Sequence, residues 1–430
     1  MGIISAAKQL FGARPNLAQQ PAKVGAPRIS ATYQRLTVDS LSNELLGLSK
    51  ERLIARLSSM RTLFSSEKGK AGFFTRDRAL LTLDPAKKTI VVGDLHSNIK
   101  RLDKLLDEYG PQLASGELQL VFLGDIVHPE RKDLCDLTTF LKTLSAFIVL
   151  KSKFPDRVHV IEGNHDIVFK ENDYRMAASK INIPQAYLLN VLLEQYMKET
   201  LGCSRGETKL IISLFQSFFD QSPRAAIVEG THGAVYMAHS AVVKGGITRE
   251  ALAASRSDEE LSYQLLNNRP IGCGGPNYTF IMGAVPVSRD ALTNTADFLL
   301  KQKYIEIVKG EVVVTKKIDG VFPNDFNIDA NITEEERLAV YQYLKDIRVK
   351  SQYREEDFFA TRQGLGLHPY SWIVSGHTPR EGDWKYIPFE KCPRHAIIHG
   401  NVPGKFGVMV IERGDPTFRD IDDPAIADSV

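Results

Sequence analysis

Short apolar runs, each ending in a cluster of polar residues, recur along the middle and C-terminal parts of the chain. Six of them read KTIVVGD, LQLVFLGD, RVHVIEGNHD, AVYMAHS, SWIVSGHT and HAIIHGN. Continuous Val, Ile and Leu runs of strand length, several followed by helix-like segments, are typical of an α/β sheet covered on both faces. Ligand sites in such sheets gather beyond the carboxyl ends of the strands. We therefore expect the polar clusters to converge on one site.

Helical patterns surround these runs. LSNELLGLSKERLIARLSSMRTLF places leucines at three- to five-residue intervals, which predicts one or two amphipathic helices. Two longer inserts, at about 174–220 and 285–360, also have helical spacing. In the second insert, Thr333 and Glu336 form a capping-box pattern that opens a helix.

These patterns divide the chain into four parts. The N-terminal part is rich in Ala, Pro, Gln and Arg without sustained periodicity, which is typical of a flexible lead-in. The division is a lead-in at 1–35, a helical flank at 36–84, a catalytic domain with the two inserts at 85–415, and a C-terminal tail at 416–430.

Composition narrows the function classes. The chain has 430 residues, 43% of them hydrophobic, which is ample for a sizeable core. Lys and Arg total 54 against 52 Asp and Glu, so bulk charge gives no reason to expect nucleic acid as a partner. No apolar run is long enough to span a membrane, and the four cysteines form no CxxC pair. We expect a soluble, cytosolic protein whose oligomeric state is unknown.

The polar clusters contain residues that bind metals. Carboxylates, imidazoles and one amide oxygen suit borderline-hard divalent ions such as Mn, Fe or Zn. Two such ions, roughly 3.5–4 Å apart, can polarise a phosphoryl group and share a hydroxide nucleophile. A single histidine or aspartate after a strand more often packs or caps a helix, so the hypothesis depends on the joint occurrence. The candidate residues are Asp94, His96, Asp125, Asn164, His165, His239 and His377.

The order of three motifs resembles a known family. GDLHS at 93–97, GDIVH at 124–128 and GNHD at 163–166 are similar to the signature motifs of the phosphoprotein phosphatase family of calcineurin-like metallophosphatases. AHSAVVKGG at 238–246 and GHTP at 376–379 resemble its later histidine motifs. The resemblance implies the calcineurin-like fold, with central β-sheets flanked by helices, over about residues 85–415.

The resemblance also implies roles for matching residues. Asp94 and His96 would bind a first metal ion and Asp125 would bridge two ions, of which manganese is the first expectation and iron or zinc the alternatives. Asn164, His239 and His377 would bind the second ion. His165 would be the general acid that protonates the leaving oxygen, a role that suits a pKa near neutrality. Asp166 stands where the family commonly has glutamate.

Departures from the family leave the phosphate contacts open. The family usually continues GDxVDRG, but this chain has GDIVHPE, with His128 in place of the aspartate that orients the acid and Pro129 in place of a phosphate-binding arginine. Arg131 either reaches back to phosphate or is simply solvated. Arg362 aligns loosely with the family's second phosphate-binding arginine.

Two further residues are candidates on weaker grounds. Asp325, in NDF, resembles an aspartate segment of the family. His399 either contacts phosphate or a metal, or packs at a strand end.

The leading hypothesis is a dinuclear metal-dependent protein phosphatase that hydrolyses phosphomonoesters on proteins by metal-bound hydroxide. Phosphotyrosine is favoured over phosphoserine and phosphothreonine, because a phenolate leaves more readily from a site with a weakened acid or clamp. One alternative is a hydrolase of dinucleoside polyphosphates or nucleotides with the same fold, and another is a catalytically dead binding scaffold. The chain also resembles the Wip group of phosphatase effectors that Legionella delivers into host cells, which would imply a host cytosol as its location.

Overall fold

All six apolar runs form β-strands. Each run is fully buried or nearly so, which the continuous Val, Ile and Leu pattern predicts for strands covered on both faces. The strands are β3 (Lys88–Val92), β4 (Leu118–Phe122), β5 (Val158–Val160), β7 (Val235–Ala238), β12 (Trp372–Ser375) and β14 (His395–Ile398).

The computed structural model describes only part of the chain. Most of the predicted lead-in and much of both inserts, including the helix expected at Thr333, lie outside the described residues. The described residues fall within the unit Arg35–Val430. They are 35–66, 75–77, 79–127, 137–166, 193–194, 196–270, 305–308, 311–314, 352–377, 383–400, 402, 404–422 and 427–428.

The first sheet has the order β17-β16-β15-β3-β4-β5. β3, β4 and β5 are parallel, so their carboxyl ends lie at one edge. β15 (Gly407–Glu412), β16 (Asp415–Asp420) and β17 (Ala427–Asp428) extend the sheet by antiparallel pairing. Described residues of the predicted C-terminal tail at 416–430 thus form strands of this sheet. Arg413 and Gly414, with φ of 55° and 85°, form a tight turn that folds β16 back on β15.

The second sheet has the order β1-β2-β6-β7-β12-β14-β13, in which β7, β12 and β14 are parallel. The other strands are β1 (Thr75–Asp77), β2 (Leu80–Thr82), β6 (Ala225–Val228) and β13 (Lys385–Tyr386). β2 pairs with β6, so the predicted helical flank at 36–84 is helical only in its first part. A three-residue strand is too short to produce a periodicity that distinguishes it from a helix.

The two sheets pack face to face, with a shared core between them. Val91 and Val121 from the first sheet belong to the same buried cluster as Met237, Val374 and Ile398 from the second. This packing brings the carboxyl ends of β3, β4 and β5 next to those of β7, β12 and β14. Residues far apart in the sequence therefore meet at one edge of the sandwich.

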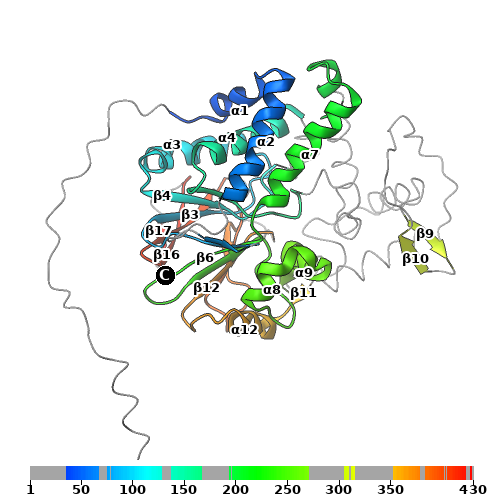
Figure 1. The fold of residues 1–430 in the computed structure, drawn as a ribbon. Helices are drawn as coiled ribbons and strands as arrows, with labels where there is room; N and C mark the ends of the chain where they lie inside the picture. The colour runs from blue at the N-terminus through cyan, green and yellow to red at the C-terminus, as the bar shows by residue number, and fades with distance from the viewer. Residues whose placement is uncertain are drawn as a thin grey trace, which may run out of the picture. The chain divides into compact units, whose positions relative to one another are not determined.

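Helices cover the outer faces of both sheets (Figure 1). α3 (Ile99–Ser115) and α4 (Leu137–Lys153) lie against the first sheet, where Phe147 meets Phe122 edge to face. α8 (Arg249–Ala254), α9 (Glu259–Asn267) and α12 (Glu355–Gly364) pack on the second sheet through Leu252, Leu265 and Phe358. The sheets and helices thus form the expected α/β arrangement.

Three further helices form the predicted helical parts. α1 (Val38–Leu46) packs on α4, and α2 (Lys50–Ser66) packs on α7 (Arg205–Gln221) from the first insert. Capping boxes begin α1 at Thr37 and α7 at Ser204, which satisfy backbone N–H groups of the first turn. The remaining elements are η2 (Ser255–Ser257), β8 (Arg269–Pro270), which pairs with β11 (Gln352–Tyr353), and the hairpin of β9 (Ile305–Val308) and β10 (Glu311–Val314).

Candidate metal centre

The candidate residues follow the carboxyl ends of the strands, and several have a strained backbone. Among the described residues, five non-glycine residues have positive φ, and His96, Ser97, Asp125 and His377 are four of them. Such conformations persist where the surrounding structure enforces them, and they gather at functional sites. The strain therefore marks the ends of β3, β4 and β12 as one constrained site.

Asp125 lies at the centre of this site. Its Oδ2 atom lies 3.5 Å from Nε2 of His239, 3.8 Å from Nε2 of His165 and 4.0 Å from Nε2 of His96. Its Oδ1 atom accepts a hydrogen bond of 2.6 Å from the backbone N–H of His165. The carboxylate thus lies among side chains from both sheets.

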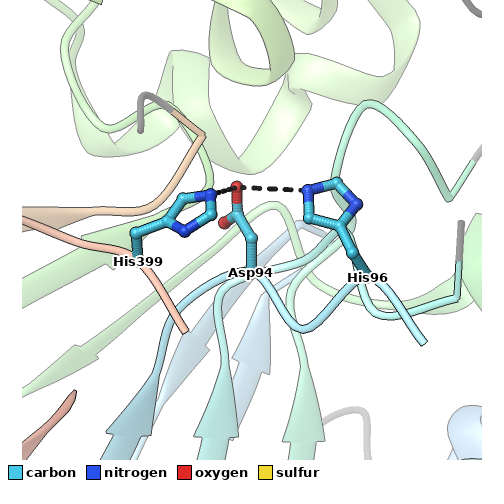
Figure 2. Close-up of side chains that lie close together, drawn as sticks. All are labelled: Asp94, His96 and His399. Carbon is cyan, nitrogen blue, oxygen red and sulfur yellow. Dashed lines mark ion pairs between the residues drawn. The ribbon is translucent and has the colours of Figure 1, made fainter. Parts of the chain in front are cut away.

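The first group of ligand atoms surrounds Asp94. Figure 2 shows its carboxylate between two imidazoles, with Nε2 of His399 at 3.6 Å and Nε2 of His96 at 3.9 Å from Oδ2. The backbone N–H of His377 donates to both carboxylate oxygens at 3.0 Å. A Cβ on Gly376 would collide with Asp94 Oδ1, which explains why glycine precedes this histidine.

The second group consists of Asp125, Asn164, His239 and His377. The Nδ1–H of His239 donates to the carbonyl of Leu123 at 2.7 Å, so Nε2 carries a lone pair in the neutral ring. This Nε2 faces Asn164 Oδ1 at 3.2 Å and His377 Nδ1 at 3.0 Å.

The chemistry of these atoms fits a cation. Asn164 Oδ1 and Asp125 Oδ2 are acceptors, and in the neutral ring the lone pair of His239 Nε2, which faces both of them, is an acceptor as well. Converging lone pairs in a buried site repel each other unless a positive charge lies between them. The donor set of imidazole nitrogens, carboxylates and an amide oxygen suits Mn, Fe or Zn.

His165 is the most accessible imidazole of the site. Its side chain is 14% exposed, whereas those of His96 and His239 are 2% and 0% exposed. Its ring meets the ring of His96 edge to face, with centroids 5.1 Å apart. Its role as the general acid stays a prediction, for which some exposure to a bound substrate is required.

Asp166 connects the motif at 124–128 to its own motif at 163–166 through hydrogen bonds. Its carboxylate accepts backbone hydrogen bonds from Gly163 at 2.9 Å, Asp125 at 2.8 Å and Ile126 at 3.0 Å. Burial and the negative charge of Asp125 raise the pKa of Asp166 to about 7, against the effect of these three N–H groups. The shorter aspartate therefore performs a positioning role in this chain.

Two residues of the site were missed by the sequence analysis. Arg269, at the start of β8, places its Nε 3.0 Å from Nε2 of His377, and burial lowers the pKa of its guanidinium. Asn267 accepts from Asn164 Nδ2 at 3.2 Å through its side chain, and its carbonyl lies 3.2 Å from His377 Nε2. The sequence feature that could have indicated these two residues is the polar run NNRP at 267–270. This run lies at the end of a helix, whereas the other polar clusters follow apolar strands.

The expected phosphate contacts have different outcomes. The guanidinium of Arg362 lies on α12, where it donates to the carbonyl of Pro369 at 3.0 Å and lies over the rings of Phe358 and Phe359. Its role in phosphate binding stays a prediction. His128, Arg131 and Asp325 lie outside the described residues.

Comparison with known proteins agrees with this architecture. The family model for calcineurin-like phosphoesterase matches residues 87–381, which is more than half of the chain. Serine/threonine-protein phosphatase BSL2 of Arabidopsis thaliana is 34% identical over 79 residues, which cover 18% of this chain and 7% of BSL2. The chain thus matches only a small part of this relative.

One solved structure covers most of the chain. A protein serine/threonine phosphatase from Saccharomyces cerevisiae, described as similar to human phosphatase PP5, has a TM-score of 0.48 and 14% identity over 87% of each chain. Among the described residues, no helix is long and apolar enough to cross a membrane. The match of the family model carries the conclusion that this chain belongs to the calcineurin-like phosphoesterases, a family of metal-dependent hydrolases of phosphate esters.

Proposed function

We propose that this protein is a dinuclear metal-dependent protein phosphatase. The observation that carries the proposal is the position of Asp125, whose Oδ2 lies within 4.0 Å of three imidazole nitrogens from both sheets. A carboxylate in this position can bind two cations at once, one on each side. One group of ligand atoms lies around Asp94 and another around His239, and a third group, of His96, Asp125 and His165, shares His96 with the first and Asp125 with the second.

The proposed ligands divide between two positions. Asp94, His96 and Asp125 would hold the first ion, and Asp125, Asn164, His239 and His377 would hold the second. Manganese is the first candidate, with iron and zinc as alternatives. When bound, the two ions polarise the phosphoryl group and lower the pKa of water, which is the chemistry that a hydrolase of phosphomonoesters needs.

The chain's own residues supply proton transfer and phosphate binding. His165, at the rim, gives its proton to the leaving oxygen of the substrate. Arg269 binds the phosphate. If His377 holds the second ion through Nδ1, its Nε2 would carry the proton and would donate to the carbonyl of Asn267. The Nε–H of Arg269 then loses its acceptor on the ring, and a phosphate oxygen is the acceptor that fits a guanidinium.

We favour phosphotyrosine as the substrate residue. A phenolate is a better leaving group than an alkoxide and depends less on a strong general acid. BSL2, the relative that matches over 79 residues, is named a serine/threonine-protein phosphatase, so phosphoserine and phosphothreonine peptides belong in the same test. A dinucleoside polyphosphate covers the small-molecule alternative.

Phosphate release from matched phosphotyrosine, phosphoserine and phosphothreonine peptides tests the proposal. We expect turnover with manganese, none with chelator, and a loss of at least about a hundredfold in Asp125→Asn, because each ion contributes several kcal/mol to stabilising the transition state. Asp420→Asn is the matched control, since Asp420 is also buried but accepts hydrogen bonds from Phe406 and Asp422 in another part of the fold.

Two other outcomes would indicate a different function. Release only from a dinucleoside polyphosphate would replace the protein substrate by a small molecule. Two bound ions without turnover of any substrate would leave the binding scaffold as the function.

A further inference from the structure

His399 has no assigned role in the two metal positions, yet it lies directly beside one of them. It follows β14, and its side chain is 3% exposed. Its Nε2 lies 3.6 Å from Asp94 Oδ2, on the side of the carboxylate opposite His96 (Figure 2). One candidate ligand atom from each of these three residues lies within 4.8 Å of the other two.

These separations match a group of atoms around one cation. With metal–ligand bonds of about 2.1 Å, two ligand atoms lie about 3 Å apart when adjacent and about 4 Å apart when opposite. The measured separations of 3.6 Å and 3.9 Å fall within that interval. The third separation, between the two imidazole nitrogens, is at most 4.8 Å.

The backbone after β14 fixes the position of His399. Its N–H donates to the carbonyl of Trp384 at 2.8 Å. The guanidinium of Arg101 donates to the carbonyls of Gly400, Val402 and Lys405, which belong to the turn that follows. Arg101 lies on α3, the helix that begins shortly after Asp94 and His96. One helix therefore fastens both segments that meet at this carboxylate, which is the kind of support that ligand residues require.

The parallel strands explain why two histidines serve two positions. β12 and β14 are hydrogen-bonded neighbours, and a histidine that approaches Asp94 follows each of them within two residues. His377 contributes its backbone N–H to Asp94 and its ring to the group around His239, whereas His399 contributes its ring to Asp94. Adjacent strand ends thus direct one imidazole to each side of the site.

We infer that His399 is a protein ligand of the first metal ion, together with Asp94, His96 and Asp125. The inference rests on the proposed dinuclear centre and adds to its ligand set. Two imidazoles and two carboxylates shift this position toward iron or zinc relative to manganese, because imidazole nitrogen suits the former ions better.

Metal binding by the full chain tests this ligand. Calorimetric titration of metal-free protein with zinc should give two ions per chain in the wild type. His399→Phe keeps a ring but removes the ligand atom. We expect one of the two sites in this variant to bind zinc at least about tenfold more weakly than in the wild type. His399→Glu supplies a carboxylate of similar reach and should restore most of that loss. The matched control is His395→Phe. His395 is a buried histidine on β14, and its ring contacts Tyr353 and Phe358 rather than the proposed metal positions.

A second measurement applies if His399→Phe does not fold. In an anomalous difference map of zinc-loaded wild-type crystals, the first ion should lie about 2.1 Å from His399 Nε2. An ion more than 3 Å away, or two-site binding unchanged in His399→Phe, would overturn the inference and leave the dinuclear centre intact. Wild-type protein that binds fewer than two ions would overturn both proposals.

Discussion

Two arginines compete for the role of phosphate ligand. The sequence pattern favours Arg362, because it precedes a glycine ahead of the late histidine motif. Arg269 instead contacts the ring of a proposed metal ligand. The two assignments differ because the position of a residue in the sequence does not determine which way its side chain points from a helix. The guanidinium of Arg362 lies over two phenylalanine rings of its own helix.

Arg269→Met should lower kcat/KM for a phosphopeptide by about 10- to 100-fold, because a hydrogen bond between two charged groups contributes about 1.5–3 kcal/mol. Arg362→Met should have a smaller effect, since the guanidinium of Arg362 has its partners on and beside α12. Steady-state kinetics of both variants decides the assignment. A larger loss in Arg362→Met would return the phosphate contact to that residue.

The loop after β5 depends on a buried ion network. Glu162, fully buried, precedes the Gly163–Asp166 motif and lies 3.3 Å from guanidinium nitrogens of Arg224 and Arg256. Its backbone N–H donates to the carbonyl of Pro223 at 3.0 Å. The network thereby connects the loop that carries Asn164 and His165 to the segment that leads from α7 into β6.

Glu162→Gln should lower the free energy of unfolding by about 3 kcal/mol, because Arg224, only 3% exposed, loses the carboxylate that compensates its buried charge. Urea unfolding at neutral pH measures this change. Glu412→Gln is the matched control, as Glu412 is 61% exposed and pairs with Lys88 at the surface, where loss of a pair costs less than about 1 kcal/mol. Equal effects of both variants would exclude a structural role for the network.

Stability of the whole chain in acid should depend on His395. Burial lowers the pKa of His395 from 6.5 to about 3, so the folded protein keeps the ring neutral while the unfolded chain protonates it. Its contribution to stability is therefore intact above pH 6.5 and declines as pH falls from there toward 3.

Between pH 7.5 and pH 5, this residue alone should reduce the free energy of unfolding by about 2 kcal/mol, from 1.36 kcal/mol per pKa unit. His395→Phe should lack that part of the decline, although the variant can be less stable at pH 7.5 because the hydrogen bond between Tyr353 and the imidazole is lost. Urea unfolding at the two pH values gives the comparison. An equal decline in both proteins would show that His395 does not cause the loss of stability between pH 7.5 and pH 5.

Local pattern was sufficient for the strands and for most of the candidate site. The apolar runs had the length and composition of buried strands, and the polar residues that follow each run could be expected at the carboxyl edge. Asp94, Asp125 and His239 could therefore be grouped without coordinates. Short strands such as β2 and β16 could not be recognised, because three to six residues without a continuous apolar pattern resemble loop or helix equally well.

Only the packing of one sheet on the other decided which atoms meet. Arg269 follows a helix and no apolar run, and the role of His399 stayed open because a strand-end histidine has two ordinary uses. Their positions depend on contacts between residues more than a hundred positions apart, such as Arg269 with His377 and His399 with Asp94. A sequence pattern reports the period and burial of its own segment, whereas the distance between two strand ends depends on how the sheets pack and on the connections between them.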